Sequence, residues 1–525
     1  MTQAADNNTE KSRGFTRFLN TVEYLGNLLP HPITLFAIFC IAILIISGIA
    51  GYFGVSAQDP RPGGETIYAV SLLNADGLRM IVTNLVTNFT GFTPLGTVLV
   101  ALLGVGVAER SGLISAAMRG LVMNAHPRLV TVTVVFAGVV SNTAAELGYV
   151  VLVPLAAMIF HSLGRHPLAG LAAAFSGVSA GYSANLLIGT VDPLLSGITQ
   201  EAAKLIDPSY TVGAEANWYF MFVSTFLIAA LGTFVTEKIV EPKLGKYDPS
   251  EATIDLADNK IESLSRAEKR GLWAALFSFL VLMGLLALTV VPADGILLNP
   301  ETGEISGSPF LKGVVVYIFF AFAIPGFVYG RVVGSMKSDR DVIDAMSHSM
   351  STMGMYIVLV FFAAQFVKFF DWTNLGTIFA INGAEFLQNV GLTGPTVFIL
   401  FIFMCAFVNL MLGSASAQWA ITAPIFVPML MMIGYAPEVI QAAYRIGDST
   451  TNVITPMMSY FGLILAVATR YKKDLGIGTL IATMLPYTIF FLIGWMSLFF
   501  IWVFGFDLPV GVNTPTYYDF NAVSQ

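Results

Sequence analysis

Long apolar stretches recur along this chain from residue 32 to residue 505. One helix needs about 20 predominantly apolar residues to cross the hydrocarbon core of a membrane. The composition agrees, since 56% of the residues are hydrophobic and only 11% are charged, against about 25% charged in an ordinary soluble domain. We therefore expect an integral membrane protein. An ordinary soluble enzyme is excluded, and the scattered charges of the chain offer no basic face for a nucleic acid.

Nine apolar blocks have the length of complete crossings. They lie at 32–53, 93–110, 168–192, 218–236, 271–292, 311–333, 346–370, 438–466 and 477–505. Two more blocks, 128–160 and 395–433, are long enough to enter the membrane and return, and small polar residues interrupt each of them. Irregular backbone at that depth is tolerated only where it is buried in protein or lines a cavity. The sequence therefore predicts an all-α membrane protein with nine transmembrane helices and two re-entrant helical hairpins.

Lysine and arginine, which gather in cytoplasmic loops, indicate the orientation of the chain. With a cytoplasmic N-terminus, 20 of the 26 basic residues fall on the cytoplasmic side, and seven of these lie in the loop 237–270. The C-terminal tail then lies outside. The loop is expected to form a short helix near 263–270, where Ser265 and Glu268 match a capping box.

This orientation opens the two hairpins to opposite sides, as in an inverted repeat. The tips resemble each other, with Ser141-Asn-Thr-Ala-Ala-Glu146 in the first hairpin and Ser414-Ala-Ser-Ala-Gln418 in the second. A further interruption follows each hairpin, as Gly181-Tyr-Ser-Ala-Asn185 before Asp192-Pro193 and as Gly447-Asp-Ser-Thr-Thr-Asn452 before Thr455-Pro456. The expected organisation is a cytoplasmic segment 1–31, scaffold helices 32–127 and 201–394, transport cores 128–200 and 395–466, and a last span with its external tail, 467–525.

Four ionisable residues lie within the interrupted segments, namely Glu146, Asp192, Arg445 and Asp448. A charged side chain near the bilayer centre costs roughly 2.5 to 3.5 kcal/mol, so it needs a partner or a wet cavity. Arg445 and Asp448 are three residues apart, so a purely structural explanation is that they form an ion pair on one face of a helix. In the functional interpretation Arg445 holds an anionic substrate, while Asp192 and Asp448 take sodium or a proton. A turn-capping role before Pro193 remains the alternative for Asp192.

The hairpin tips supply small polar side chains. Ser141, Asn142 and Thr143 in the first tip, and Ser414 with Ser416 in the second, bring hydroxyl and amide oxygens close to helix ends, where an anion or sodium can bind. Close packing of the hairpin arms is the alternative explanation. Asn185 and Asn452 belong to the two later interruptions and join the candidate substrate and ion sites. Trp419 follows the second tip, and it either stacks on an aromatic substrate with a free indole N–H or packs in the core.

Several chemistries have no motif in this sequence. There is no GxxxxGK[ST] phosphate loop, no HExxH pair and no glycine-rich dinucleotide turn after a strand, so we expect neither an enzyme nor direct use of ATP. Cys40 and Cys405 lie inside apolar runs and are expected to pack, without a disulfide or metal role. We expect no cofactor beyond a coupling ion.

At these residues the chain resembles the AbgT family of p-aminobenzoyl-glutamate and antimetabolite transporters, and most closely its MtrF-like subgroup. The resemblance covers nearly the whole chain, and its most specific stretches are Ser141–Tyr149, Ser183–Leu194, Gly413–Trp419 and Gly434–Asp448. It implies a bowl-shaped homodimer in a bacterial inner membrane, with the C-terminus in the periplasm. It also implies a substrate path lined by Asp192, Ser416, Trp419, Pro437, Arg445, Asp448 and Pro456.

The resemblance further implies ion-coupled export of p-aminobenzoyl-glutamate-like folate fragments and sulfonamides by alternating access, driven by H⁺ or Na⁺. An aromatic ring suits Trp419, and an anionic group suits Arg445. The nearest alternative is a sodium-coupled dicarboxylate importer, whose hairpin tips resemble Ser141-Asn-Thr. An intramembrane hydrolase would need Asp192 and Asp448 as a close carboxylate pair, and a passive channel would not need paired hairpins.

Overall fold

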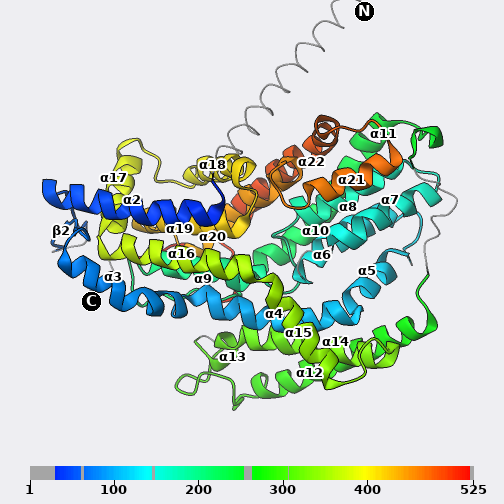
Figure 1. Ribbon diagram of the computed structural model, residues 1–525, viewed down its shortest axis with the longest axis horizontal. Helices are drawn as coiled ribbons and strands as arrows, with labels where there is room; N and C mark the ends of the chain where they lie inside the picture. Colours follow the sequence, from blue (N-terminus) through cyan, green and yellow to red (C-terminus); the bar gives the residue numbers. More distant parts are fainter. Residues whose placement is uncertain are drawn as a thin grey trace, which may run out of the picture.

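The computed structural model describes residues 30–60, 64–123, 125–144, 148–253, 263–305 and 307–520. Most of the expected N-terminal segment 1–31 and the candidate Glu146 lie outside these residues. Within them the fold is almost entirely helical (Figure 1). Two short antiparallel strands, β1 (Ser56–Gln58) and β2 (Thr66–Tyr68), pair Ala57 with Ile67.

Eight helical segments in the described part of the chain are long and apolar enough to cross a membrane. They are Pro32–Phe53, Ala75–Ser111, Trp218–Leu244, Arg266–Val290, Val314–Val333, Gly354–Trp372, Ala415–Met432 and Ile477–Gly505. Seven of them overlap predicted crossings, and Ala415–Met432 is the second arm of a predicted hairpin. The membrane character is thus confirmed, while the count of nine crossings and two re-entrant hairpins stays a prediction.

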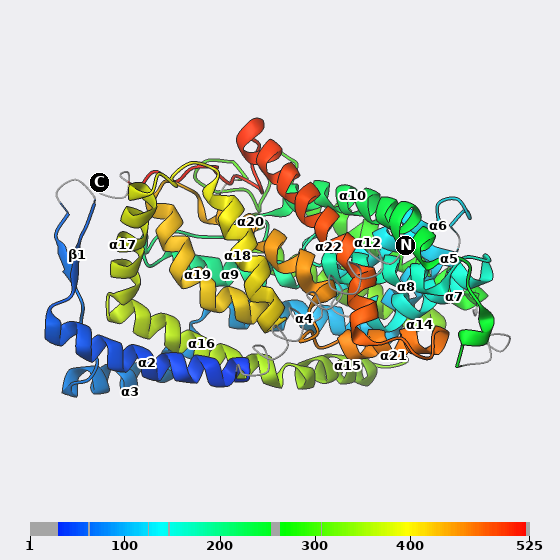
Figure 2. The same ribbon diagram turned by 90° about the horizontal axis from the view of Figure 1, so that it is seen from above.

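The scaffold helices lie mainly along the left and lower sides of the molecule in Figure 1, and most of the first core lies at its right edge in both Figure 1 and Figure 2. Their contacts join α4 with α14, α12 with α14, α2 with α16, and α10 with α22. Gly104 and Gly326 allow α4 and α14 to approach closely, since a Cβ on Gly104 would lie 2.3 Å from the Phe319 carbonyl oxygen. Small residues commonly permit such packing in membranes. The helices are α2 (Pro32–Phe53), α3 (Ala75–Thr90), α4 (Thr93–Ser111), α5 (Leu113–Met123), α10 (Trp218–Val235), α11 (Glu241–Leu244), α12 (Arg266–Val290), α13 (Pro309–Lys312), α14 (Val314–Val333), α15 (Asp339–Thr352), α16 (Gly354–Trp372), α17 (Leu375–Asn389) and α22 (Ile477–Phe499).

The first predicted core forms two short arms followed by a broken helix. The arms are α6 (Val130–Ser141) and α7 (Val153–Ser162), and the broken helix comprises α8 (Pro167–Phe175) with its π-helical end Ser176–Ala180, then irregular backbone, then α9 (Val191–Ala203). Both arms pack on α8. The interruption predicted at Gly181–Asn185 is therefore confirmed, because the backbone leaves the helix after Ala180 and α9 begins only at Val191.

The second core repeats this arrangement. Its arms are α18 (Val397–Leu412) and α19 (Ala415–Met432), and its broken helix comprises α20 (Pro437–Thr451), a 3₁₀ turn Asn452–Ile454, an interruption and α21 (Phe461–Tyr471). Both arms pack on α20. The block 438–466 is thus interrupted as predicted, but α20 continues from Gly447 to Thr451, so the break begins at the end of the predicted stretch Gly447–Asn452.

The two cores interlock. The half-helix α9 of the first core packs on α19 and α20 of the second, whereas α21 of the second packs on α8 of the first. Reciprocal packing of this kind is expected of a repeat, and it buries part of each interruption between the cores. The inverted orientation of the cores across a membrane stays a prediction.

Two local predictions can be compared with the structure directly. The capping box is confirmed, since the Ser265 hydroxyl accepts a hydrogen bond from the Glu268 amide and the Glu268 carboxylate accepts one from the Ser265 amide. This cap opens α12, so the predicted short helix near 263–270 is the first turn of a span rather than a separate helix. The predicted span 346–370 begins too early, because α16 begins at Gly354 and residues before it belong to α15.

Candidate functional site

The two interruptions meet in the protein interior. The Ser183 amide of the first donates to the Ser449 hydroxyl on α20 at 3.2 Å. The Asn452 side-chain amide of the second donates to the Ser179 carbonyl at 3.3 Å. Ser183, Ser179 and Ser449 are fully buried, so each interruption satisfies part of its backbone with the other core.

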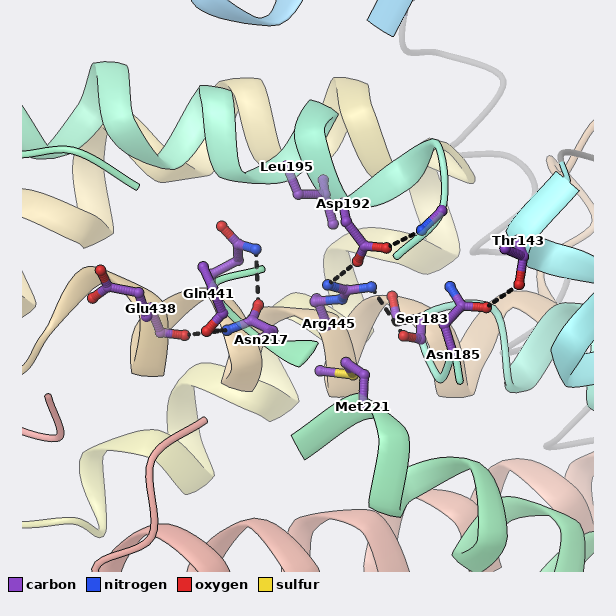
Figure 3. A network of polar contacts seen from close by, with 12 residues as sticks. Thr143, Ser183, Asn185, Asp192, Leu195, Asn217, Met221, Glu438, Gln441 and Arg445 are labelled. Atoms are coloured by element: carbon purple, nitrogen blue, oxygen red, sulfur yellow. Dashed lines mark hydrogen bonds and ion pairs between the residues drawn. The ribbon is translucent and has the colours of Figure 1, made fainter. Parts of the chain in front are cut away.

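An ion pair bridges the two cores at this meeting point (Figure 3). The Arg445 Nη1 on α20 lies 2.7 Å from the Asp192 Oδ1 at the start of α9. Both side chains are almost fully buried, at 1% and 7% exposure. Arg445 Nη2 donates to the Ser183 carbonyl at 2.9 Å, while its Nε has no hydrogen-bond partner among the described residues. The alternative explanation, a simple helix ion pair between Arg445 and Asp448, is not observed, since the guanidinium pairs with Asp192 of the other core instead.

Asp192 also has the capping role proposed as its alternative. Its second oxygen, Oδ2, accepts a hydrogen bond from the Gly189 amide at 2.7 Å. One oxygen therefore fixes the turn that precedes α9, and the other holds Arg445. The turn-capping role of Asp192 is therefore observed, and its predicted role in taking sodium or a proton stays a prediction.

The first hairpin tip lies against the first interruption. Thr143 donates to the Asn185 side-chain oxygen at 3.4 Å, as Figure 3 shows. A Cβ on Gly189 would lie 3.0 Å from the Thr143 Cα, so only glycine allows this approach. Ser141 donates to the Gly138 carbonyl at 2.6 Å. Asn142 Oδ1 is buried without a hydrogen-bond partner in the described chain, which leaves an oxygen available at the tip.

The second tip lies against the second interruption in the same way. Gly413 has a left-handed backbone, with φ of 57°, and its added Cβ would lie 3.1 Å from the Met457 backbone. The hydroxyls of Ser414 and Ser416 are 3.5 Å apart and half-buried. Each tip therefore packs on the interruption of its own core. Whether sodium binds at either tip stays a prediction.

Trp419 contradicts one sequence-based expectation. Its indole N–H is not free, because it donates to the Thr199 hydroxyl at 2.9 Å. Its ring stacks on Tyr444 with centroids 4.2 Å apart, and the side chain is fully buried. In this conformation Trp419 packs in the core, and a substrate ring would have to displace Tyr444 to stack on it.

Asp448 is buried beside Tyr444, on α20. The Tyr444 hydroxyl approaches its Oδ1 at 3.4 Å and donates to the Ala415 carbonyl at 2.6 Å. Asp448 Oδ2 has no hydrogen-bond partner in the described part of the chain. A buried oxygen without a partner could accept a proton or a small cation, and the coupling role of Asp448 stays a prediction.

Asn409 is a site residue that the sequence did not single out. Its amide nitrogen lies 2.7 Å from the Asp448 carbonyl and 2.7 Å from the Asn452 side-chain oxygen. It therefore ties α18 to the end of α20. The sequence could have indicated Asn409, because it is an amide side chain inside the otherwise apolar run of α18.

A row of neutral polar side chains leads from Trp419 toward the loop 204–217. Thr199 donates to the Gln441 oxygen, and the Gln441 amide donates to Asn217 at 2.8 Å. Asn217 in turn donates to the Glu438 backbone carbonyl at 2.8 Å. Figure 3 shows the Glu438 side chain pointing away from this row. Glu438 and Gln441 lie within the stretch Gly434–Asp448 that carries the family resemblance, but the sequence predicted no role for either residue.

The two predicted prolines have different positions. Pro437 begins α20 and is buried, where its missing N–H costs no helical hydrogen bond. Pro456 lies in the irregular backbone between α20 and α21 and is half-buried. Pro437 therefore marks the start of the second broken helix and Pro456 lies within its interruption, while contact of either residue with a substrate stays a prediction.

A cavity of about 660 Å³ opens between the scaffold and the first core. Its walls are almost wholly apolar and come from α5, α6, α12 and α14. Its lining also includes Ser141 and Thr143 of the first tip, Glu215, and the polar aromatic residues Trp218 and Tyr317. Among the described residues, no three His, Cys, Asp or Glu side chains form a group suited to a metal ion.

Interrupted helices that meet around a buried ion pair, within a set of apolar spans, define a multi-pass membrane transporter. The model of the AbgT putative transporter family matches residues 17–518, and the chain belongs to this family. The resemblance seen in the sequence is therefore confirmed.

Named relatives agree with the family assignment. The chain is 37% identical over 490 residues to the p-aminobenzoyl-glutamate transport protein of Escherichia coli, covering 93% of this chain and 95% of that protein. The structure of Neisseria gonorrhoeae MtrF, presented as illuminating a class of antimetabolite efflux pumps, matches with a TM-score of 0.90 and 62% identity. This match covers 95% of this chain and all of that one. The Alcanivorax borkumensis YdaH transporter matches with a TM-score of 0.85 and 47% identity, over 92% of this chain and all of that one. Relatives of this chain are transporters and efflux pumps, so the chain is a transporter and not an enzyme.

Proposed function

We propose that this protein is an ion-coupled secondary transporter that exports p-aminobenzoyl-glutamate-like folate fragments and sulfonamide antimetabolites across a bacterial inner membrane by alternating access. The Arg445–Asp192 ion pair carries this proposal. It lies where the two cores meet, and a rearrangement that separates the cores must also break it. The names of the relatives support the substrate class.

Competition for Arg445 explains how substrate and ion are coupled. A substrate carboxylate that binds the guanidinium displaces Asp192, because both anions need the same N–H groups. The released Asp192 is then a buried carboxylate without a cation, which is unfavourable until it takes H⁺ or Na⁺. Arg445 Nε, which lacks a partner in the described chain, supplies an additional donor for the incoming anion.

The reciprocal packing of the cores supports the proposal of alternating access. Each tip contacts the interruption of its own core, whereas the contacts between the cores include the Arg445–Asp192 pair and the hydrogen bond from Ser183 to Ser449. Sliding one core past the other would open the ion pair first to one side and then to the other. We also propose a homodimer with a cytoplasmic N-terminus and periplasmic C-terminus, for which α12, the least buried of the candidate spans, offers an apolar surface.

Transport in proteoliposomes tests the proposal. Radiolabelled p-aminobenzoyl-glutamate or a sulfonamide is followed in both directions, with pH and sodium gradients imposed separately. The wild type should move substrate against its gradient with one of the two ions, and Asp192→Ala and Asp448→Ala should abolish this. Full gradient-driven flux in both variants would refute the coupling assignment. Preference for succinate over p-aminobenzoyl-glutamate in competition would favour the dicarboxylate importer.

A further inference from the structure

Glu438 in the first turn of α20 is a buried acid that the mechanism above does not use. Its side chain is 5% exposed, and the Tyr210 hydroxyl lies 2.9 Å from its Oε2 and 3.2 Å from its Oε1. No described lysine, arginine or histidine lies within ion-pair distance of it, as the ion pairs of the described chain show. Glu201 makes an instructive contrast, since it is equally buried but has Lys204 at 3.2 Å and Lys368 at 4.0 Å.

The groups that face Glu438 give it no positive charge. Tyr210 and Glu215 of the loop 204–217 act on Glu438 directly, while Asp207 and Tyr518, whose hydroxyl lies 3.4 Å from Asp207, act on its partner Tyr210. Burial raises the pKa of the Tyr210 hydroxyl, so Tyr210 stays a hydrogen-bond donor. Burial also raises the pKa of Glu215, which adds no compensating charge.

An ionised carboxylate in such surroundings is costly, because its lost hydration is not replaced by a cation. The amides at the start of α20 favour an anion by their dipole, but typically by only about 0.3 to 1 kcal/mol. One hydrogen bond and a helix start therefore do not replace a counter-ion. The neutral carboxylic acid is the form that this site accommodates.

Glu438 lies across a joint between the two cores. Its side chain contacts Tyr210 and its carbonyl accepts from Asn217, both on the loop after α9, while Glu438 itself begins α20. Any movement of α20 away from this loop removes the hydroxyl partner and opens the carboxyl to water. The protonation of Glu438 is thus tied to the same movement that separates Arg445 from Asp192.

We propose that Glu438 is a proton-binding site of the transport cycle, distinct from Asp192 and Asp448. It holds one proton as a neutral acid while α20 contacts the loop 204–217, and it gives that proton to water when they part. The proposal rests on the function proposed above, because it assigns a coupling proton to that cycle. The row Asn217, Gln441 and Thr199 links the Glu438 backbone carbonyl, not its carboxyl group, to Trp419.

Infrared spectroscopy tests proton binding without any transport substrate. The purified full-length protein in lipid should show the C=O stretching band of a protonated, buried carboxylic acid. Glu438→Gln should remove this band, whereas Tyr210→Phe should shift it to higher frequency, because the band loses its hydrogen bond. Glu201→Gln is the matched control and should leave the band in place, since Glu201 is ion-paired. If Glu438→Gln removes only a carboxylate band, or if sodium shifts that band, Glu438 is ionised and the proposal is wrong.

Transport separates coupling from a merely structural role. In proteoliposomes Glu438→Gln should retain substrate exchange at equal pH on both sides. It should lose the stimulation of flux by a pH gradient, falling to the level seen without a gradient, while Glu201→Gln keeps that stimulation. Retention of the full pH-gradient effect in Glu438→Gln would overturn the proposal. If wild-type protein moves none of the offered substrates, the proposed substrate class fails, and the infrared result still decides whether Glu438 holds a proton.

Discussion

The Arg445 guanidinium and the Asp192 carboxylate lie 2.7 Å apart although they belong to different cores of the chain. Their contact joins the end of one interruption to the middle of the opposite broken helix. Because the two residues belong to different cores, this ion pair exists only while the two cores hold their present relative position.

Asp192→Asn should destabilise the protein strongly. The substitution leaves Arg445 buried without its counter-ion, and breaking a buried pair typically costs about 3 to 5 kcal/mol. Replacing both residues, as Asp192→Asn with Arg445→Gln, should recover part of this loss while transport stays absent. Thermal unfolding in detergent, followed by fluorescence, measures both effects. A double variant whose loss equals the sum of the two single losses would show that the pair does not interact.

Trp419 and Thr199 should separate stability from substrate binding. Thr199→Val leaves the buried indole N–H without an acceptor, which costs about 1 to 3 kcal/mol in unfolding free energy. Trp419→Phe removes the donor with the indole and should cost less through that hydrogen bond. If the ring at 419 contacts substrate, Trp419→Phe should weaken substrate binding and Thr199→Val should not. Binding titrations alongside thermal unfolding distinguish the two, and equal losses of affinity would contradict this prediction.

Gly413→Ala should damage the second hairpin tip. A residue with a side chain in the left-handed region costs roughly 1 to 2 kcal/mol, and the added Cβ would also press on the Met457 backbone. Gly462→Ala on α21 is the matched control, because no atom lies within 4 Å of its added Cβ and alanine favours a helix. Unfolding should shift downward for Gly413→Ala only. An equal response of both variants would argue against a strained tip.

Asn409→Leu should loosen the end of α20. It removes the donor that reaches the Asp448 carbonyl and the Asn452 oxygen, and buried acceptors without a partner cost about 1 to 3 kcal/mol. Asn382→Leu is the control, since Asn382 bonds only within its own helix at Ile378. Hydrogen exchange of residues 448–455 should increase in Asn409→Leu alone. Unchanged exchange there would mean that Asn409 does not hold the interruption.

Local patterns in the sequence were sufficient for elements whose cause is local. The Ser265 cap, the apolar spans and the polar interruptions follow from residues that are neighbours in the chain. The partner of Arg445 did not follow, because Asp448 is three residues away on the same helix whereas the true partner, Asp192, comes from the other core. Trp419 shows the same limit, since its stacking on Tyr444 and its bond to Thr199 depend on how α19 packs on α9 and α20.

Glu438 shows what a sequence pattern misses at a buried site. Beside Pro437 it looks like an ordinary acid in the first turn of a helix, where carboxylates are common. Only the packing of the loop 204–217 over it removes the water and leaves Tyr210 as its partner. Its importance therefore comes from tertiary burial, which no local pattern reveals.

The packing of α9 on the second core and of α21 on the first also constrains the order in which the protein folds during its synthesis. The ribosome releases Asp192 long before it makes Arg445, so the first core must enter the bilayer with an acid that has no counter-ion. That half of the molecule is then an incomplete intermediate, in which the carboxylate must stay protonated, remain near the lipid headgroups or be shielded by the insertion machinery. Maturation of the binding centre is consequently a late event, completed only when the second core has threaded its half-helix against the first.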